Sequence, residues 1–99
     1  MIVVTGVVEI DAEHVWPATT AAGKMIEATQ KEEGCITYCL YVDITDQRKF
    51  RIYEEWASEE ALAAHMKTPH MAEFQKALSE FRIFDRKIVK YQVNVVQGL

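Results

Sequence analysis

The distribution of apolar residues along the chain predicts four β-strands. Four segments are rich in β-branched and aromatic residues and largely alternate between apolar and polar positions, as strands do. They cover residues 2–10, 35–44, 49–57 and 83–96. The polar residues Thr45-Asp46-Gln47 form a turn between the second and third segments. The pattern therefore predicts a sheet of four strands.

A helix is expected between the first two strands, because the apolar residues there follow helical spacing. The residues Asp11 to Glu13 offer an N-cap, and Pro17 suits the first turn. The helix is expected to run to about Glu33, since Gly34 follows as a C-terminal stop.

The region after the third strand contains an interrupted helix. Ser58 is placed to cap a short first part, and Thr68 followed by Pro69 is typical of a new helix start. The second part carries one apolar stripe, formed by Met71, Phe74, Leu78 and Phe81. The resulting order is that of the ferredoxin-like βαββαβ fold, an α+β architecture with both helices on one face of an antiparallel sheet.

Both faces of the expected sheet are apolar. A sheet face that meets water is normally polar. In the first strand one face carries Ile2, Val4, Val8 and Ile10, and the other carries Val3 and Val7. In the last strand Val89, Tyr91, Val93 and Val95 share one face. One chain covers only one face with helices, so we expect the other face to pack on a second subunit in a homodimer.

Length and composition narrow the class of protein. The 99 residues fit a single domain, residues 1–99, and 49% of them are hydrophobic. A net charge of -4 without a long basic cluster argues against a nucleic-acid surface. No apolar run is long enough for a membrane span, and the N-terminal residues do not resemble a signal peptide, so we expect a cytoplasmic protein. Cys35 and Cys39 are too far apart along one strand for a disulfide, which indicates reduced thiols.

The third strand carries a carboxylate among apolar residues. Glu54 and Trp56 share one strand face with Phe50 and Ile52, so the Glu54 carboxyl is expected to face inward. Desolvation at such a place raises a carboxyl pKa, and a raised pKa suits proton transfer. The structural alternative is a carboxylate that pairs with a cation or with a backbone amide.

Two histidines follow at the same corner. His65 lies three residues after Leu62 on the inward helix face, and His70 lies one turn before Phe74. Either imidazole could act as an acid or a base near neutral pH, and the alternative for each is a hydrogen-bonded core histidine. Their spacing across Pro69 is not the i, i+4 spacing of helical zinc pairs, and no third ligand beyond Glu54 is evident. The sequence therefore assigns no metal ligand.

The residues described above form a pattern that resembles the antibiotic biosynthesis monooxygenase family. The resemblance covers nearly the whole chain. It rests first on Glu33-Gly34-Cys35-x-x-Tyr38. It rests also on Tyr53-Glu54-x-Trp56-x-Ser58-x-x-Ala61-Leu62-x-x-His65-x-x-x-Pro69-His70. The resemblance implies a dimeric ferredoxin-like α+β barrel, in agreement with the homodimer expected from the strand pattern.

The resemblance also implies several activities. Some members oxygenate quinols or polycyclic phenols without a metal or flavin, some degrade heme, and one branch isomerises a phosphorylated autoinducer. Heme-degrading members use an Asn on the first strand and a Trp on the second helix, where this chain has Thr5-Gly6 and His65, so heme cleavage is disfavoured. The isomerase remains an alternative, and the nearest cation for its anion site is Lys67.

On this resemblance we expect a cofactor-independent monooxygenase whose partners are a small aromatic substrate and O₂. The enzyme would remove a proton from the substrate, which then reacts with O₂ in a site that excludes water. The resemblance makes His65 the base, His70 a second polar contact and Glu54 the group that orients a histidine. Contacts to the substrate would come from Trp56, Tyr38 and Phe74. A non-catalytic dimeric domain that binds a small ligand or is associated with stress is the alternative from another class.

Overall fold

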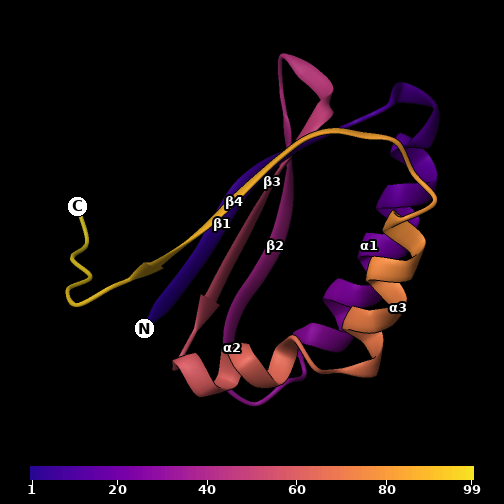
Figure 1. Cartoon of the computed structure of the whole chain (residues 1–99). Helices are drawn as coiled ribbons and strands as arrows, with labels where there is room; N and C mark the ends of the chain where they lie inside the picture. The colour runs from indigo at the N-terminus through magenta and orange to yellow at the C-terminus, as the bar shows by residue number, and fades with distance from the viewer.

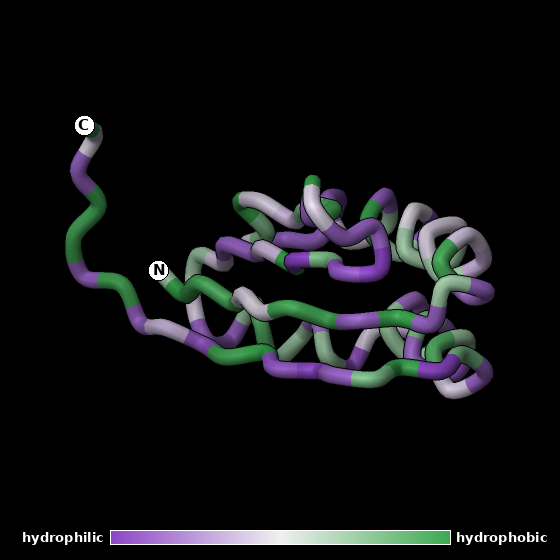
Figure 2. The backbone as a smooth tube through the Cα atoms, turned by 90° about the horizontal axis from the view of Figure 1, so that it is seen from above, coloured by the Kyte–Doolittle hydropathy of each residue, from purple (hydrophilic) through white to green (hydrophobic).

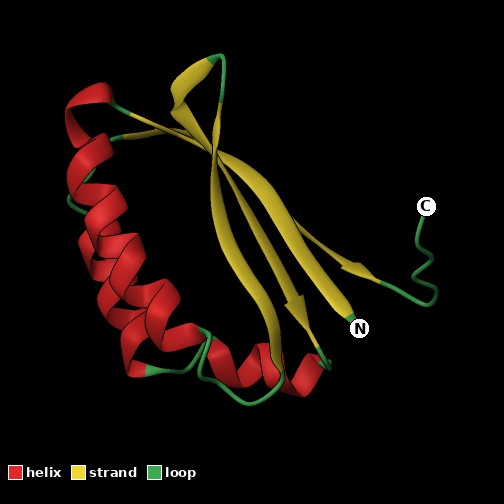
Figure 3. Ribbon diagram, turned by 180° about the vertical axis from the view of Figure 1, so that it is seen from behind, coloured by secondary structure: helices red, strands yellow, loops and turns green.

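The computed structural model describes residues 1–99 as one antiparallel sheet with its helices on one side (Figures 1 and 3). The strand order across the sheet is β2–β3–β1–β4. The strands are β1 (Ile2–Ile10), β2 (Cys35–Asp43), β3 (Asp46–Trp56) and β4 (Ile83–Gln92). The helical elements are the 3₁₀ turn η1 (Ala12–His14), α1 (Val15–Thr29), α2 (Glu59–His65) and α3 (Pro69–Leu78). This arrangement confirms the predicted ferredoxin-like α+β fold.

None of the helices has both the length and the apolar character that a bilayer crossing requires.

The core lies between the sheet and the helices. On β3 the side chains of Phe50, Ile52, Glu54 and Trp56 point into it and are all buried, as the alternation predicted. The small residues Ala18 and Ala22 of α1 are also buried, which lets the helix approach the sheet closely. Further buried apolar side chains are Ile2, Ile10, Met25, Tyr38 and Met71.

The first helix is shorter than predicted. It ends at Thr29, and the amide of Glu32 then donates to the Thr29 carbonyl (2.9 Å) in the tightened turns that follow. Gly34 has a φ of +82°, a value that favours glycine. A Cβ at Gly34 would lie 2.5 Å from the Cβ of Ala61, so this glycine also lets the turn pack closely on α2.

Two strand boundaries differ from the prediction because of local hydrogen bonding. β3 begins at Asp46, since the turn consists of Ile44 and Thr45 and the Asp43 carboxylate accepts from the Thr45 amide (2.7 Å). β4 ends at Gln92, which pairs with Ile2 at the start of β1. Beyond that point Val93 donates one bond to the Met1 carbonyl (2.9 Å), and the remaining chain extends away from the sheet (Figures 1 and 2).

The outer face of the sheet is not covered by any element of the chain (Figure 3). The apolar side chains on it include Tyr41, Val89 and Tyr91, which are 56%, 42% and 55% exposed. Polar groups lie between them: Tyr53 donates to the Glu55 carboxylate (2.9 Å), and the Thr37 hydroxyl also bonds to Glu55 (2.5 Å). This face therefore combines apolar rings with an ordered polar group.

Strand β1 approaches β4 closely at Gly6. Gly6 pairs with Ile88 and is buried. A Cβ built on Gly6 would lie 2.0 Å from the Lys87 carbonyl oxygen and 2.5 Å from the Ile88 Cα. No side chain fits at that separation, so the course of β4 depends on the glycine.

Candidate functional site

A small cavity lies between the inner face of the sheet and the helices. Its volume is about 100 Å³, and 13 of its 16 lining residues are hydrophobic. The polar side chains that line it are Thr19, Glu54 and Arg86, and Tyr38 contributes a phenol. Arg86 and Ile88 are exposed residues of β4, so the cavity borders on solvent along that strand. Such a space suits a flat apolar group with one or two polar substituents.

Glu54 is the carboxyl group of this cavity. Only 7% of the residue is exposed, and its Oε1 accepts a hydrogen bond from the indole Nε1–H of Trp56 (2.8 Å). Burial raises the pKa of Glu54, while the bond from Trp56 and the nearby His65 partly oppose this rise. A carboxylate with a raised pKa is a stronger base than one in water.

An aromatic wall separates the cavity from the corner that holds the histidines. Tyr38 lines the cavity, and its ring centroid lies 6.3 Å from Trp56 in an edge-on arrangement and 5.3 Å from His65. Trp56 is fully buried and lies 4.8 Å from His65, centroid to centroid. Burial raises the pKa of the Tyr38 phenol well above its usual range, so Tyr38 remains protonated at neutral pH.

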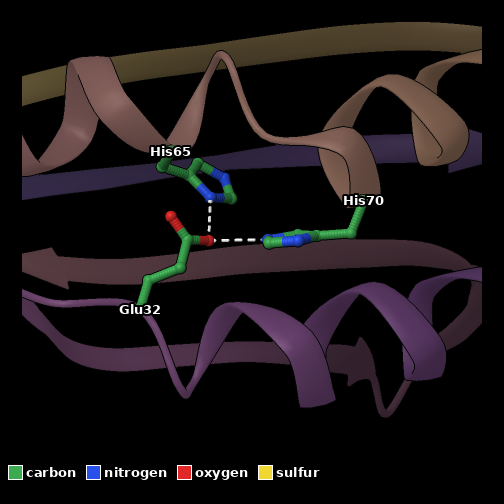
Figure 4. A group of neighbouring side chains, drawn as sticks. All are labelled: Glu32, His65 and His70. Atoms are coloured by element: carbon green, nitrogen blue, oxygen red, sulfur yellow. Dashed lines mark hydrogen bonds and ion pairs between the residues drawn. The ribbon is translucent and has the colours of Figure 1, made fainter.

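Behind this wall one carboxylate holds both histidines (Figure 4). Glu32 comes from the turn between α1 and β2, His65 ends α2, and His70 lies in the first turn of α3. The Oε2 atom of Glu32 is 2.7 Å from His65 Nδ1 and 2.7 Å from His70 Nε2. Because an ionised carboxylate can only accept, each of these ring nitrogens carries the proton of its hydrogen bond.

The second ring nitrogen of His65 has no partner. His65 is 1% exposed, and its Nε2 atom is buried without a hydrogen bond. With the proton on Nδ1, the neutral ring leaves a lone pair on this atom. A buried polar atom without a partner is uncommon in a folded protein, so the Nε2 atom of His65 requires an explanation.

The structure places the six candidate residues in three positions. The cavity is lined by Tyr38, Glu54 and Phe74. His65 and Trp56 lie one layer further from the cavity, against the ring of Tyr38. His70 faces a groove between α1 and α3, which Phe74 also lines. The expected role of Glu54 as the group that orients a histidine is wrong, because Glu54 accepts from Trp56 and Glu32 holds both histidines.

Two residues of the site were not found from the sequence. Glu32 is separated from its histidines by 33 and 38 residues, and no local pattern links them. Arg86 lies on β4, where the sequence pattern did not mark it as a site residue. Its position at the cavity follows from the strand pairing, which places it opposite Val8. Two features of the sequence could have indicated them. Glu32 is a polar residue two positions before the turn glycine Gly34, and Arg86 is a polar residue on the inward face of β4.

Comparisons with known proteins agree with this fold. Residues 1–77 match the model of the antibiotic biosynthesis monooxygenase family. The chain therefore belongs to this family, which confirms the resemblance found in the sequence.

Individual relatives extend the similarity over the whole chain. An uncharacterised protein of Synechocystis is 29% identical over 98 residues, which are 99% of this chain and 67% of that protein. A Deinococcus radiodurans structure assigned to the antibiotic biosynthesis monooxygenases has a TM-score of 0.93, 25% identity and coverage of 100% and 98%. A Bacteroides thetaiotaomicron protein of unknown function, suggested to be an oxidoreductase, has a TM-score of 0.83, 32% identity and coverage of 91% and 94%.

Proposed function

We propose that this protein is a monooxygenase that needs no bound cofactor and that oxidises a quinol, or one ring of a larger phenol. The observation that carries the proposal is the Glu54 carboxyl, with its raised pKa, in the wall of a mainly apolar cavity. Membership of the antibiotic biosynthesis monooxygenase family supports the reaction class.

The size of the cavity favours a single ring. An apolar protein cavity of about 150 Å³ accommodates benzene, and the volume here is about 100 Å³. One ring therefore fits after small side-chain movements, and any further ring would extend toward the exposed part of β4. Arg86 at that border would attract a phenolate or another anionic substituent.

The reaction needs only proton removal, binding and exclusion of water. The Glu54 carboxylate accepts the proton of a quinol hydroxyl, and the resulting quinolate passes one electron to O₂. The ring radical and superoxide then combine into a C–O bond, and loss of water leaves a hydroxyquinone. For a simple benzoquinol the balance is quinol plus O₂ to hydroxybenzoquinone plus water, so the substrate supplies every electron.

We assign the base to Glu54 rather than to His65. Glu54 lines the cavity, whereas His65 lies behind Tyr38 and Trp56. When His65 is protonated, its charge lowers the pKa of Glu54. His65 therefore influences the basicity of Glu54 although it does not line the cavity. Glu32 positions His65 through the bond to Nδ1.

The test is oxygen consumption with a panel of benzoquinols and naphthols in the presence of a chelator. We expect uptake by the wild type and a loss of roughly 10²–10⁴-fold in the Glu54→Gln variant, in which an amide replaces the base. Glu60→Gln is the matched control, because Glu60 is exposed on α2. With ¹⁸O₂, one labelled atom should enter the product. No uptake with any compound, or unchanged uptake by Glu54→Gln, contradicts the proposal.

A second candidate is isomerisation of a phosphorylated ligand, the other activity implied by the resemblance. Arg86 favours it, because this guanidinium is the cation that lines the cavity. We place it second because the remaining lining is mainly hydrophobic and offers no further cation for a phosphate.

We also propose that two copies of the chain pair through their outer sheet faces. The exposed apolar side chains on that face support this pairing. They include Tyr41, Val89 and Tyr91. The extended segment after β4 carries the exposed residues Val95 and Val96 and could pack on the same partner (Figure 2).

A further inference from the structure

The group of Glu32, His65 and His70 has the composition of a transition-metal site. Its donor atoms are one carboxylate oxygen and two imidazole nitrogens, and all three lie within 4.8 Å of one another. Two histidines and one carboxylate are the protein ligands of many catalytic zinc sites and of the non-heme iron facial triad. The three residues come from separate segments that converge only in the fold (Figure 4).

We propose that Glu32, His65 and His70 bind a divalent first-row transition metal ion such as Zn²⁺ or Co²⁺. Mg²⁺ and Ca²⁺ are disfavoured, because both prefer ligand sets made of oxygen. This site is distinct from the cavity and goes beyond the proposed oxygenase reaction, which does not use a metal.

The three donor atoms would move when an ion binds. Zinc binds imidazole nitrogen and carboxylate oxygen at about 2.0–2.2 Å, so two donors on one tetrahedral ion are about 3.3 Å apart. Glu32 Oε2 now lies 2.7 Å from each nitrogen, in hydrogen bonds that the ion would replace. Each of these two carboxylate–imidazole pairs therefore needs to open by about 0.6 Å, a movement within the reach of the flexible Glu32 side chain. The two imidazole nitrogens lie within 4.8 Å of each other, so His70 would also adjust its position to complete the site.

The site is accessible from one side. His65 is closed off in the core, but the side chains of His70 and Glu32 are 24% and 14% exposed. His70 also borders the groove between α1 and α3, which gives an ion an entry path. Water from this side could fill the remaining coordination positions, as in zinc sites with three protein ligands.

Binding would change the tautomer of both histidines. A metal ion takes the lone pairs of His65 Nδ1 and His70 Nε2, so the proton of each neutral ring moves to its other nitrogen. The Nε2 atom of His65 is without a partner in the present structure. The Nε2 atom of His65 would therefore lack a hydrogen-bond partner in either tautomer. Its burial alone does not disfavour the metal-bound form relative to the metal-free form.

The test is a titration of the chelator-treated, full-length protein with Co²⁺, followed by competition with Zn²⁺. We expect one Co²⁺ per chain with a visible absorption spectrum typical of low coordination number, and displacement of that spectrum by Zn²⁺. Glu32→Gln and His70→Asn should each weaken binding by at least about tenfold, since each removes a direct ligand. His65 is left unchanged, because its substitution would open the core.

Three control variants make the assignment specific. Glu33→Gln changes the exposed neighbouring carboxylate. His14→Gln changes a histidine that accepts from the Arg82 amide at another corner. Cys35→Ser removes the free thiol closest in sequence to Glu32. All three should bind Co²⁺ as the wild type does, with circular dichroism to show that each variant is folded.

The proposal is overturned by any of three results: no change in the Co²⁺ spectrum, equal affinity in folded Glu32→Gln and wild type, or loss of binding in a control variant. None of these readouts depends on oxygen consumption. Failure of the oxygenase proposal would therefore leave this test intact, and the reverse also holds.

Discussion

At the scale of single residues, Glu54 shows how one position on a strand acquires unusual chemistry. The alternation of β3 turns its side chain into the core, and its solvation is then replaced by one hydrogen bond from Trp56. A single neutral donor does not compensate fully for the lost hydration of a carboxylate, so the pKa of Glu54 is raised above its usual range.

Because the fold raises the pKa of Glu54, the stability of the protein should depend on pH through this group. The folded protein holds the Glu54 proton more tightly than the unfolded chain does, because the fold raises the pKa of this carboxyl. The contribution of Glu54 to the free energy of unfolding is therefore fully present below the pKa of the unfolded state. It is lost as the pH rises through the pKa of the folded state. Glu54→Gln does not titrate. The stability of this variant relative to wild type should therefore increase with pH, by up to about 1.4 kcal/mol for each unit by which the fold raises the pKa.

Urea unfolding measured between about pH 5 and about pH 8 would check this, since most unperturbed carboxylates are already ionised there. Glu60→Gln is the control, because the Glu60 side chain is exposed. A difference between Glu54→Gln and wild type that stays constant over this pH range would show that Glu54 does not titrate there.

The sequence predicted the direction of individual side chains better than their partners. Period-two alternation was enough to bury Glu54 beside Trp56, because direction on a strand is a local property. The partner of the two histidines could not be predicted in this way. Glu32 reaches them only because the turn after α1 packs against α2, where Gly34 approaches Ala61. That approach depends on tertiary packing.

At the scale of elements, the break between α2 and α3 determines the geometry of the histidine corner. On a continuous helix, residues five apart point in different directions, at about 100° per residue. Here Thr68 and Pro69 start a new helix between His65 and His70, so that both rings face Glu32. The sequence predicted this break from the cap and the proline, but it did not give the angle between the helices.

The Thr68 side chain makes two hydrogen bonds at this break. Its hydroxyl donates to the His65 carbonyl (2.8 Å) and accepts from the Met71 amide (3.3 Å). Thr68→Ala should therefore destabilise the protein by about 1 kcal/mol, the usual effect of losing an N-cap. Thr68→Ser retains the hydroxyl and should lie close to wild type. Thermal or urea unfolding measures both variants, and equal stability of the Ala variant and wild type would contradict a capping role.

At the scale of the whole molecule, the uncovered sheet face is the main open surface. A second copy could be expected from the sequence, because apolar residues on both faces of a strand require two covers. The bond between Thr37 and Glu55 could not be predicted, because it joins side chains of two paired strands, β2 and β3. An ordered polar group inside an apolar face would help to fix the register of two paired sheets.

We predict that the protein elutes at twice the mass of its 11.4 kDa chain. Val89→Asp places a charge on the outer face and should shift the protein toward the monomer, because a buried unpaired carboxylate is costly. Ile44→Asp is the control, since Ile44 is 99% exposed in the turn between β2 and β3. Size-exclusion chromatography with light scattering distinguishes the outcomes, and a wild-type monomer contradicts the homodimer.

The close approach at Gly6 has a consequence for how this cavity can diverge in evolution. Gly6 does not line the cavity, yet β4 lies where its side chain would be, and β4 carries Arg86 and Ile88 of the lining. A mutation from glycine to a larger residue would move that strand and widen the cavity while every lining residue stays the same. The shape of the cavity can thus change through a substitution at Gly6, which does not line it. Alignments restricted to lining residues would not detect such a change.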